Sequence, residues 1–230
     1  MHDQTSQSSS RFSAPSSGDV SLTLTGPAGT LEAVLHLPEP AGVERLAVIC
    51  HPHPLHGGTM NNKVVHYLGK TFNEAGFATV KFNFRGVNHS QGTFNDGMGE
   101  TEDVLAVHDW ARQQFPKAAI WLAGFSFGAF TAFRASSQRP IGGLVLVAPP
   151  VGRFTFETLS PPPCPWLVVQ GDQDELVDCT QVVEWTRRIR PRPTLVRLKG
   201  VDHFFHGRLN DLRSVVRDFL SPRIRAAANE

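Results

Sequence analysis

The sequence predicts an α/β fold, in which helices cover both faces of one mostly parallel sheet and an antiparallel hairpin forms its N-terminal edge. Three observations predict it. Short, continuous apolar runs recur along the chain, longer segments with helical periodicity separate them, and two alternating runs precede them. Strands that are buried on both faces read as continuous apolar runs, which is the situation of strands in a parallel sheet covered by helices.

The hairpin is predicted from residues 20–37. Apolar and polar residues alternate over 20–25 and again over 31–37, and the link G-P-A-G lies between them. Alternation at period two is typical of half-buried strands, and a short link rich in Gly and Pro favours a turn. We therefore expect two antiparallel strands at the start of the domain.

Six continuous apolar runs follow the hairpin. Their ranges are 46–50, 77–82, 119–124, 143–148, 165–170 and 194–198. The segments between and after these runs favour helices, which we expect at 62–75, 100–115, 127–137, 180–190 and 209–220. The clearest helix is 100–115, because Val104, Val107 and Ala111 recur at helical spacing and acidic residues stand at its start, where the helix dipole favours negative charge.

The length of 230 residues suits a single domain, which we place at 19–222. Besides Met1, residues 1–18 hold seven serines and one large apolar residue, Phe12. So little apolar surface cannot offset the entropy lost on ordering, and the segment is predicted to be a disordered tail. Residues 223–230 are expected to form a C-terminal tail.

Charge and hydropathy exclude several classes of protein. The formal net charge of +1 gives no basic excess for binding nucleic acid. Apolar runs such as 46–50 and 144–148 are far shorter than the roughly 18 residues of a membrane-spanning helix. The first eleven residues have neither a basic start nor an apolar core, so a secretory signal is not expected and the cytoplasm is the expected location.

One short motif points to nucleophilic chemistry. Gly124, Ser126 and Gly128 form G-x-S-x-G directly after an apolar strand and at the start of a predicted helix. This strand-turn-helix setting is that of a nucleophile elbow, which presents a serine on a sharp turn. The two glycines are needed there because side chains two residues either side of the serine would keep strand and helix apart.

A serine nucleophile needs a base and a carboxylate that holds the base, and two later segments offer both. The run G-D-Q-D-E-L-V-D (171–178) follows one predicted strand, and G-V-D-H-F-F-H-G (200–207) follows the next. Both lie at the carboxyl ends of strands, where sites form in open α/β sheets. We expect Asp174 and His203 to contribute, and the spacings leave no room for a lid domain. The alternatives in the same segments are Asp172, Glu175, Asp178 and His206.

Together these segments resemble the α/β-hydrolase superfamily, and within it the small, lidless, dienelactone-hydrolase-like serine hydrolases. The resemblance covers about residues 20–220. Besides the segments above, it is carried by H-P-H-P-L-H-G-G-T-M-N-N-K-V-V (51–65) and F-N-F-R-G-V-N-H-S-Q-G-T-F (82–94). It implies that Ser126 is the nucleophile, Asp174 the acid and His203 the base, and it implies no organic cofactor. Dienelactone hydrolases carry cysteine at the elbow, so the serine argues against dienelactone as the substrate.

An oxyanion hole needs two backbone N–H groups. One is expected from Phe127, the residue after the nucleophile, and the other from the loop after strand 46–50. The two prolines of H-P-H-P-L-H-G-G have no N–H to donate. The resemblance favours Leu55 as the second donor, with His53 as the alternative.

The same loop carries a rival hypothesis. His51, His53 and His56 form H-x-H-x-x-H, which is similar to the zinc-binding H-x-H-x-D-H pattern of metallo-β-lactamase-like hydrolases. Position 55 is Leu rather than Asp, and a metal enzyme would not need an elbow serine. We therefore expect no metal site and assign these imidazoles to hydrogen bonds that fix the loop.

The expected activity is hydrolysis of small or short-acyl carboxylic esters through an acyl-enzyme, with a small-molecule ester as the partner and neither nucleic acid nor membrane. The missing lid favours small substrates because the pocket should be shallow and open. A thioesterase, amidase or peptidase would use the same machinery. From another class, a non-catalytic protein of the same fold could hold a ligand without turning it over.

Overall fold

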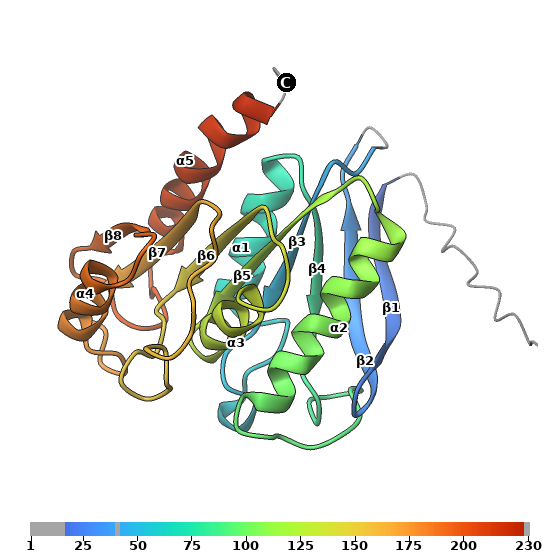
Figure 1. Ribbon diagram of the computed structural model, residues 1–230, viewed down its shortest axis with the longest axis horizontal. Helices are drawn as coiled ribbons and strands as arrows, with labels where there is room; N and C mark the ends of the chain where they lie inside the picture. The colour runs from blue at the N-terminus through green and yellow to red at the C-terminus, as the bar shows by residue number, and fades with distance from the viewer. Residues whose placement is uncertain (1–16, 40–41, 228–230) are drawn as a thin grey trace, which may run out of the picture.

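Eight strands pair into one sheet in the order β1-β2-β4-β3-β5-β6-β7-β8 (Figure 1). The computed structural model describes residues 17–39 and 42–227, with side chains as far as residue 223. The strands are β1 (Gly18–Gly26), β2 (Gly29–Leu37), β3 (Arg45–Cys50), β4 (Ala78–Phe82), β5 (Ala119–Phe125), β6 (Gly143–Val147), β7 (Trp166–Gly171) and β8 (Thr194–Leu198). The helices are the 3-10 turn η1 (Pro54–His56), α1 (Lys63–Glu74), α2 (Met98–Gln114), α3 (Phe127–Ser136), α4 (Cys179–Arg188) and α5 (Leu209–Ala227).

The pairing confirms the predicted hairpin and the six parallel strands. β1 and β2 are antiparallel, with Leu24 opposite Leu31, and β2 pairs antiparallel with β4. All other neighbours, from β4 to β8, run parallel. Each of the six parallel strands begins and ends within one residue of its predicted range.

Helices cover both faces of the sheet (Figure 1). α2, α3 and α4 pack on one face, and α1 and α5 pack on the other. In β3, Val48 belongs to the first core and its neighbours Ala47 and Ile49 belong to the second. Successive side chains of a strand point to opposite faces, so a strand covered on both sides needs an apolar residue at every position.

α2 begins at Met98, two residues before its predicted start. Gly97 adopts the left-handed conformation (φ 82°), and the Glu100 carboxylate accepts hydrogen bonds from the N–H groups of Gly97 (2.8 Å) and Asn95 (2.9 Å). A carboxylate in the first turn that bonds back to the preceding residues stabilises a helix start. The predicted boundary was wrong because it treated Glu100 as the first residue of the helix rather than as part of its cap.

α5 continues to Ala227, seven residues beyond its predicted end at residue 220. Pro222 lies inside the helix and has no N–H to donate. Arg223 donates to the Phe219 carbonyl, and its guanidinium lies 3.7 Å from the centre of the Phe219 ring. These contacts stabilise the turn around the proline. Most of the predicted tail 1–18, through residue 16, and the last three residues of the predicted tail 223–230 lie outside the described residues.

The loops that follow the parallel strands gather at the carboxyl edge of the sheet (Figure 1). β6 and β7 are joined there by residues 148–165, which contain one isolated bridge between Val151 and Phe154 and no helix. As predicted, no lid domain is inserted between the strands and helices of the described part of the chain. No helix within 17–39 or 42–227 combines the length and the apolar character needed to cross a bilayer.

Candidate active site

Ser126 stands on a sharp turn between β5 and α3. Its backbone is in an unusual conformation (φ 55°, ψ −119°), and its N–H donates to the Val147 carbonyl at 2.8 Å. A Cβ on Gly124 would lie 2.0 Å from the Gly128 carbonyl oxygen, and a Cβ on Gly128 would lie 2.3 Å from the Cys50 carbonyl oxygen. Both glycines are therefore required sterically, as the motif predicts. The strained turn holds the hydroxyl at the carboxyl edge of the central strands.

His203 joins Ser126 to Asp174. Its Nε2 lies 3.0 Å from Ser126 Oγ, and its Nδ1 lies 2.8 Å from Asp174 Oδ2. Both side chains are nearly inaccessible, with 3% of His203 and none of Asp174 exposed. A ring proton on Nδ1 facing the carboxylate leaves the Nε2 lone pair directed at the hydroxyl. The three residues predicted from sequence thus come together in a chain of hydrogen bonds.

Asp174 is held by its own loop. Oδ1 accepts hydrogen bonds from the N–H groups of Leu176 (2.9 Å) and Val177 (2.7 Å), and Oδ2 accepts one from Gln170 Nε2 (2.9 Å). Burial alone raises the pKa of Asp174, but bonding to His203 and to the two N–H groups outweighs burial and lowers the pKa below its usual value. The carboxylate is therefore ionised near neutral pH. The sequence did not predict a role for Gln170. The one indication is that this polar residue stands near the end of a buried strand.

The alternative residues have other partners. The Asp172 carboxylate accepts from the Gly200 N–H (2.6 Å), and Asp178 caps α4 by accepting from the Thr180 N–H (2.7 Å). Glu175 accepts from the backbone N–H of His203 at 3.2 Å. His206 pairs with Asp202 through Nδ1, at 2.7 Å, on the surface. Each of these side chains lies near the site, and none of these contacts is with the His203 ring.

The two predicted oxyanion donors lie in different elements, Phe127 in α3 and Leu55 in η1. Phe127 is the first residue of α3, and N–H groups in the first turn of a helix have no acceptor within the helix. Leu55 lies in η1, where its N–H donates to His53 Nδ1 at 3.2 Å. The centre of the His53 ring is 4.9 Å from that of Phe127, so η1 lies beside the elbow. In this structure the Leu55 N–H is therefore already bonded to His53.

His51 fixes the loop that carries η1. Its Nδ1 lies 2.6 Å from the Pro52 carbonyl oxygen, and its Nε2 accepts a hydrogen bond from the Phe84 N–H at 3.0 Å. Burial lowers the pKa of His51 to about 4, so the ring is neutral. His53 stacks on His56 instead of turning toward His51. Over the stretches that the structure describes, no group of three or more His, Cys, Asp or Glu side chains is arranged to hold a metal ion.

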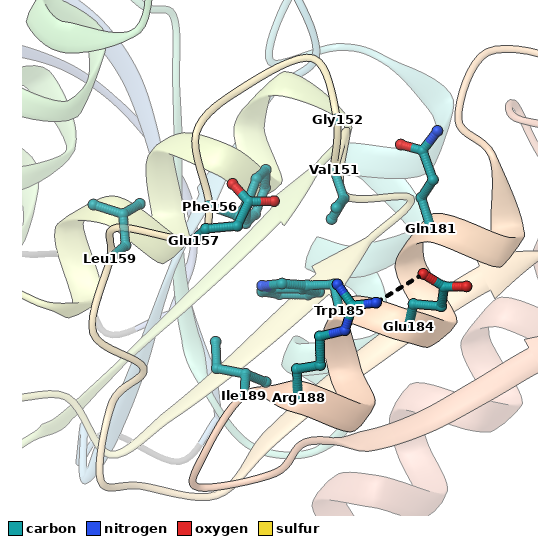
Figure 2. Close-up of a pocket in the computed structure, with 10 residues that line it drawn as sticks. All are labelled: Val151, Gly152, Phe156, Glu157, Leu159, Gln181, Glu184, Trp185, Arg188 and Ile189. Carbon is teal, nitrogen blue, oxygen red and sulfur yellow. Dashed lines mark hydrogen bonds and ion pairs between the residues drawn. The ribbon is translucent and has the colours of Figure 1, made fainter.

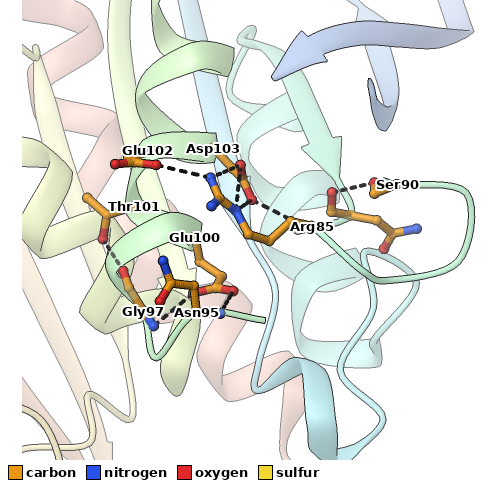
Figure 3. A network of polar contacts seen from close by, with 9 residues as sticks. Arg85, Ser90, Asn95, Gly97, Glu100, Thr101, Glu102 and Asp103 are labelled. Carbon is orange, nitrogen blue, oxygen red and sulfur yellow. Dashed lines mark hydrogen bonds and ion pairs between the residues drawn. The ribbon is translucent and has the colours of Figure 1, made fainter. Parts of the chain in front are cut away.

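A buried ion pair holds the segment after β4 (Figure 3). Arg85 donates from Nη2 and Nε to the Asp103 carboxylate, at 2.8 and 3.1 Å, and its backbone N–H donates to the same carboxylate at 2.9 Å. The pair ties this segment to the start of α2. Phe94, on the same segment, packs against the rings of His53 (4.9 Å) and Phe127 (5.8 Å). The network therefore supports the surroundings of the elbow from one side.

A cavity of about 420 Å³ lies between residues 151–159 and α4 (Figure 2). Trp185 reaches across it toward Phe156, and Glu184 and Arg188 form an ion pair at its border. None of the residues predicted to form the site lines this cavity. Phe154 connects the two regions, because its ring packs on Phe127 at 5.5 Å and it belongs to the segment that forms the cavity wall. Sequence reasoning gave no signal of the cavity.

Known proteins share this fold and much of this sequence. The model of the alpha/beta hydrolase fold family matches residues 55–163. XC6422 from Xanthomonas campestris, described as an a/b serine hydrolase without lid, is 43% identical, with a TM-score of 0.85 over 89% of this chain and 94% of its own. An alpha-beta serine hydrolase homologue from Coxiella burnetii is 45% identical, with a TM-score of 0.83 over 86% and 96% of the two chains. The protein RP471 of Rickettsia prowazekii is 36% identical over 76% of this chain and 78% of its own.

Proposed function

Because this chain belongs to the α/β-hydrolase superfamily, we propose that it is a serine hydrolase that cleaves small or short-acyl carboxylic esters. The observation that carries the proposal is the continuous hydrogen-bonded chain from Ser126 Oγ through the His203 ring to Asp174. A hydroxyl is a weak nucleophile at neutral pH unless a base accepts its proton. Ser126 has such a base at 3.0 Å.

Acylation begins when Ser126 Oγ attacks the ester carbonyl carbon and its proton passes to His203 Nε2. The carbonyl π electrons move to the oxygen. The negative charge is received by the Phe127 N–H and by the Leu55 N–H, which first has to leave His53 Nδ1. When the intermediate collapses, the bond to the alcohol oxygen breaks and His203 gives its proton to that oxygen. Asp174 keeps the imidazole oriented and stabilises its cation. The products are a free alcohol and an acyl group on Ser126.

Deacylation repeats these steps with water. His203 Nε2 takes a proton from a water molecule as the water oxygen attacks the acyl carbonyl, and the same N–H groups receive the charge. The bond to Ser126 Oγ then breaks, the proton returns to Oγ, and a carboxylic acid leaves. No step requires a metal or an organic cofactor.

Intact mass after incubation with a fluorophosphonate tests the nucleophile, because the reagent phosphonylates activated serines. We expect one adduct on the wild type, unchanged by a metal chelator, and none on Ser126→Ala. Ser137→Ala is the matched control. This serine is exposed at the end of α3 and its hydroxyl donates to the Arg134 carbonyl, so the variant should label like the wild type. A folded wild type that forms no adduct, or an adduct that persists on Ser126→Ala, would contradict the proposal.

A further inference from the structure

Four large apolar side chains remain exposed within the described part of the chain, and all four come from the carboxyl edge of the sheet. They are Leu55 (68% exposed), Met98 (49%), Leu176 (40%) and Phe204 (40%), and we call them the rim residues. They belong to segments that follow four different strands, namely β3, β4, β7 and β8. Exposed apolar groups that share one edge of the sheet are candidates for binding something apolar.

Two rim residues lie beside the acid and the base. The Phe204 ring stands perpendicular to the His203 ring, with the centres 5.0 Å apart. The Leu176 N–H donates to Asp174 Oδ1 at 2.9 Å, so its side chain leaves the backbone next to the buried carboxylate. Phe204 also borders a hollow of about 320 Å³ between the start of α1 and the β8–α5 loop.

The other two rim residues lie beside the elbow and the oxyanion loop. Leu55 is in η1, whose His53 ring contacts Phe127. Met98 follows Gly97, which is so close to the elbow helix that an added Cβ would lie 2.7 Å from the Phe130 ring. Each of these two residues is therefore one or two positions from a residue that lies against α3.

The strand order separates the two pairs. β3 and β4, which precede Leu55 and Met98, lie on one side of β5, and β7 and β8, which precede Leu176 and Phe204, lie on the other. Ser126 follows β5 directly. One apolar pair therefore flanks the nucleophile on each side along the edge of the sheet.

The chemistry of the proposed reaction decides which part of an ester meets which pair. His203 Nε2 must give its proton to the alcohol oxygen, so the alcohol lies on the side of His203 and the acyl group on the other. Resting on the proposed serine-hydrolase function, we propose that Leu176 and Phe204 contact the alcohol part and that Leu55 and Met98 contact the acyl part. The preferred substrates are then esters with apolar groups on both sides of the bond that breaks. Two side chains cover only a short chain, which fits small or short-acyl esters.

Two ester series measure the two contacts separately. The acyl series is p-nitrophenyl acetate to hexanoate, and the alcohol series is methyl to hexyl acetate. In each series the wild-type kcat/KM should rise about twofold per methylene, less than the roughly fourfold of a fully buried methylene because the rim is partly open to water. The slope of log kcat/KM against chain length is the readout, since a general loss of turnover shifts all esters equally and leaves the slope unchanged.

Each pair has its own double variant. Leu55→Ser with Met98→Ser should flatten the acyl series and leave the slope of the alcohol series, and Leu176→Ser with Phe204→Ser should do the reverse. Exposed side chains can be replaced at little cost to folding, which the thermal midpoint of each variant checks. Leu105→Ser, a half-buried change further along α2, is the matched control and should keep both slopes.

The outcomes separate the two proposals. Suppose that the wild type labels with the fluorophosphonate and cleaves esters. Flat wild-type slopes, slopes that neither double variant changes, or two variants that act on the same series would then overturn the assignment of the rim residues alone. A protein that neither labels nor cleaves any ester would overturn the serine-hydrolase proposal and this assignment with it. If Leu55→Ser with Met98→Ser flattens only the acyl series and Leu176→Ser with Phe204→Ser flattens only the alcohol series, both proposals are supported.

Discussion

Both ring nitrogens of His51 form hydrogen bonds with backbone groups. The neutral side chain therefore links two loops. The Pro52 carbonyl lies against Nδ1, and the Phe84 N–H donates to Nε2. A second proton on the ring would remove the acceptor of the Phe84 N–H and place a charge among buried atoms. The folded state therefore opposes protonation of His51.

Stability should fall in mild acid for this reason. The ordinary pKa of histidine is 6.5, and in the folded protein burial lowers the pKa of His51 to about 4. Between these values the unfolded chain binds a proton that the folded chain does not, so the free energy of unfolding decreases as the pH falls. We expect it to be about 2 kcal/mol lower at pH 5.0 than at pH 7.5 from His51 alone. Urea unfolding at the two pH values measures the difference.

His51→Gln isolates this contribution. Burial also lowers the pKa of His53, which acts in the same direction, whereas the low pKa of Asp174 affects stability only at more acidic pH. The variant should be less stable than the wild type at pH 7.5 and should lose most of the decrease toward pH 5.0. An equal decrease in the variant would show that another group is responsible.

Individual contacts of this kind could not be predicted from the sequence, although the residue types could be. Ser126, Asp174 and His203 stand in motifs whose spacing and order carry information. The partners of His51 depend on how two loops meet, 33 residues apart in the chain. Gln170 gave no comparable signal, because its contact with Asp174 depends on the geometry of one loop.

At the scale of elements, α2 is attached to the segment after β4 by one buried ion pair. Asp103 is fully buried and Arg85 nearly so. Burial raises the pKa of Asp103 above its usual value even with the guanidinium beside it, which indicates that the pair offsets a large desolvation cost. Breaking such a pair leaves an uncompensated charge in the interior.

Asp103→Asn should therefore lower the free energy of unfolding by about 3 kcal/mol, in the range expected when one partner of a buried pair is removed. The amide oxygen can still accept from the Arg85 N–H, so the loss reports mainly the charge. Adding Arg85→Met removes the remaining cation, and the double variant should be more stable than Asp103→Asn alone. Urea unfolding of the single and double variants measures both differences.

Asp109→Asn is the matched control for that experiment. Its partner Arg139 is at a similar distance, 2.9 Å, but both side chains are substantially exposed. Asp109 Oδ1 also lies 3.0 Å from His108 Nδ1, and an amide oxygen at this position can keep that contact. Solvent screens such pairs, so the expected cost is about 1 kcal/mol or less. If Asp103→Asn cost no more than Asp109→Asn, the buried pair would not be what holds α2 in place.

Helix and strand types followed from periodicity, whereas helix ends depended on side chains. The six parallel strands were predicted within one residue because a continuous apolar run is both the cause and the sign of burial on two faces. The start of α2 depends on the cap by Glu100, and the end of α5 on contacts of Arg223 around Pro222. Neither contact changes the apolar periodicity on which the prediction depended.

At the scale of the whole molecule, the sheet separates two cores that share its strands. One core lies under α2, α3 and α4, and the other under α1 and α5. Alternate residues of β3 belong to different cores, so neither core can lose its packing without exposing strands that the other needs. The order of strands also places the rim residues on both sides of Ser126, which no local pattern in the sequence indicates.

The shared strands predict that the two cores unfold together, as the single domain expected at 19–222 requires. Replacing Trp121 by Phe leaves tryptophans only in or against the first core, because Trp110, Trp166 and Trp185 all belong to it. Phe72→Ala in this background removes a fully buried ring from the second core and should lower the free energy of unfolding by about 3–5 kcal/mol. The remaining tryptophans lie on the opposite face of the sheet from Phe72. Their fluorescence should nevertheless show the full decrease in the free energy of unfolding, at the same urea midpoint as circular dichroism. A fluorescence midpoint that stays in place while circular dichroism shows an earlier transition would mean that the two cores unfold separately, in which case the shared strands do not couple them.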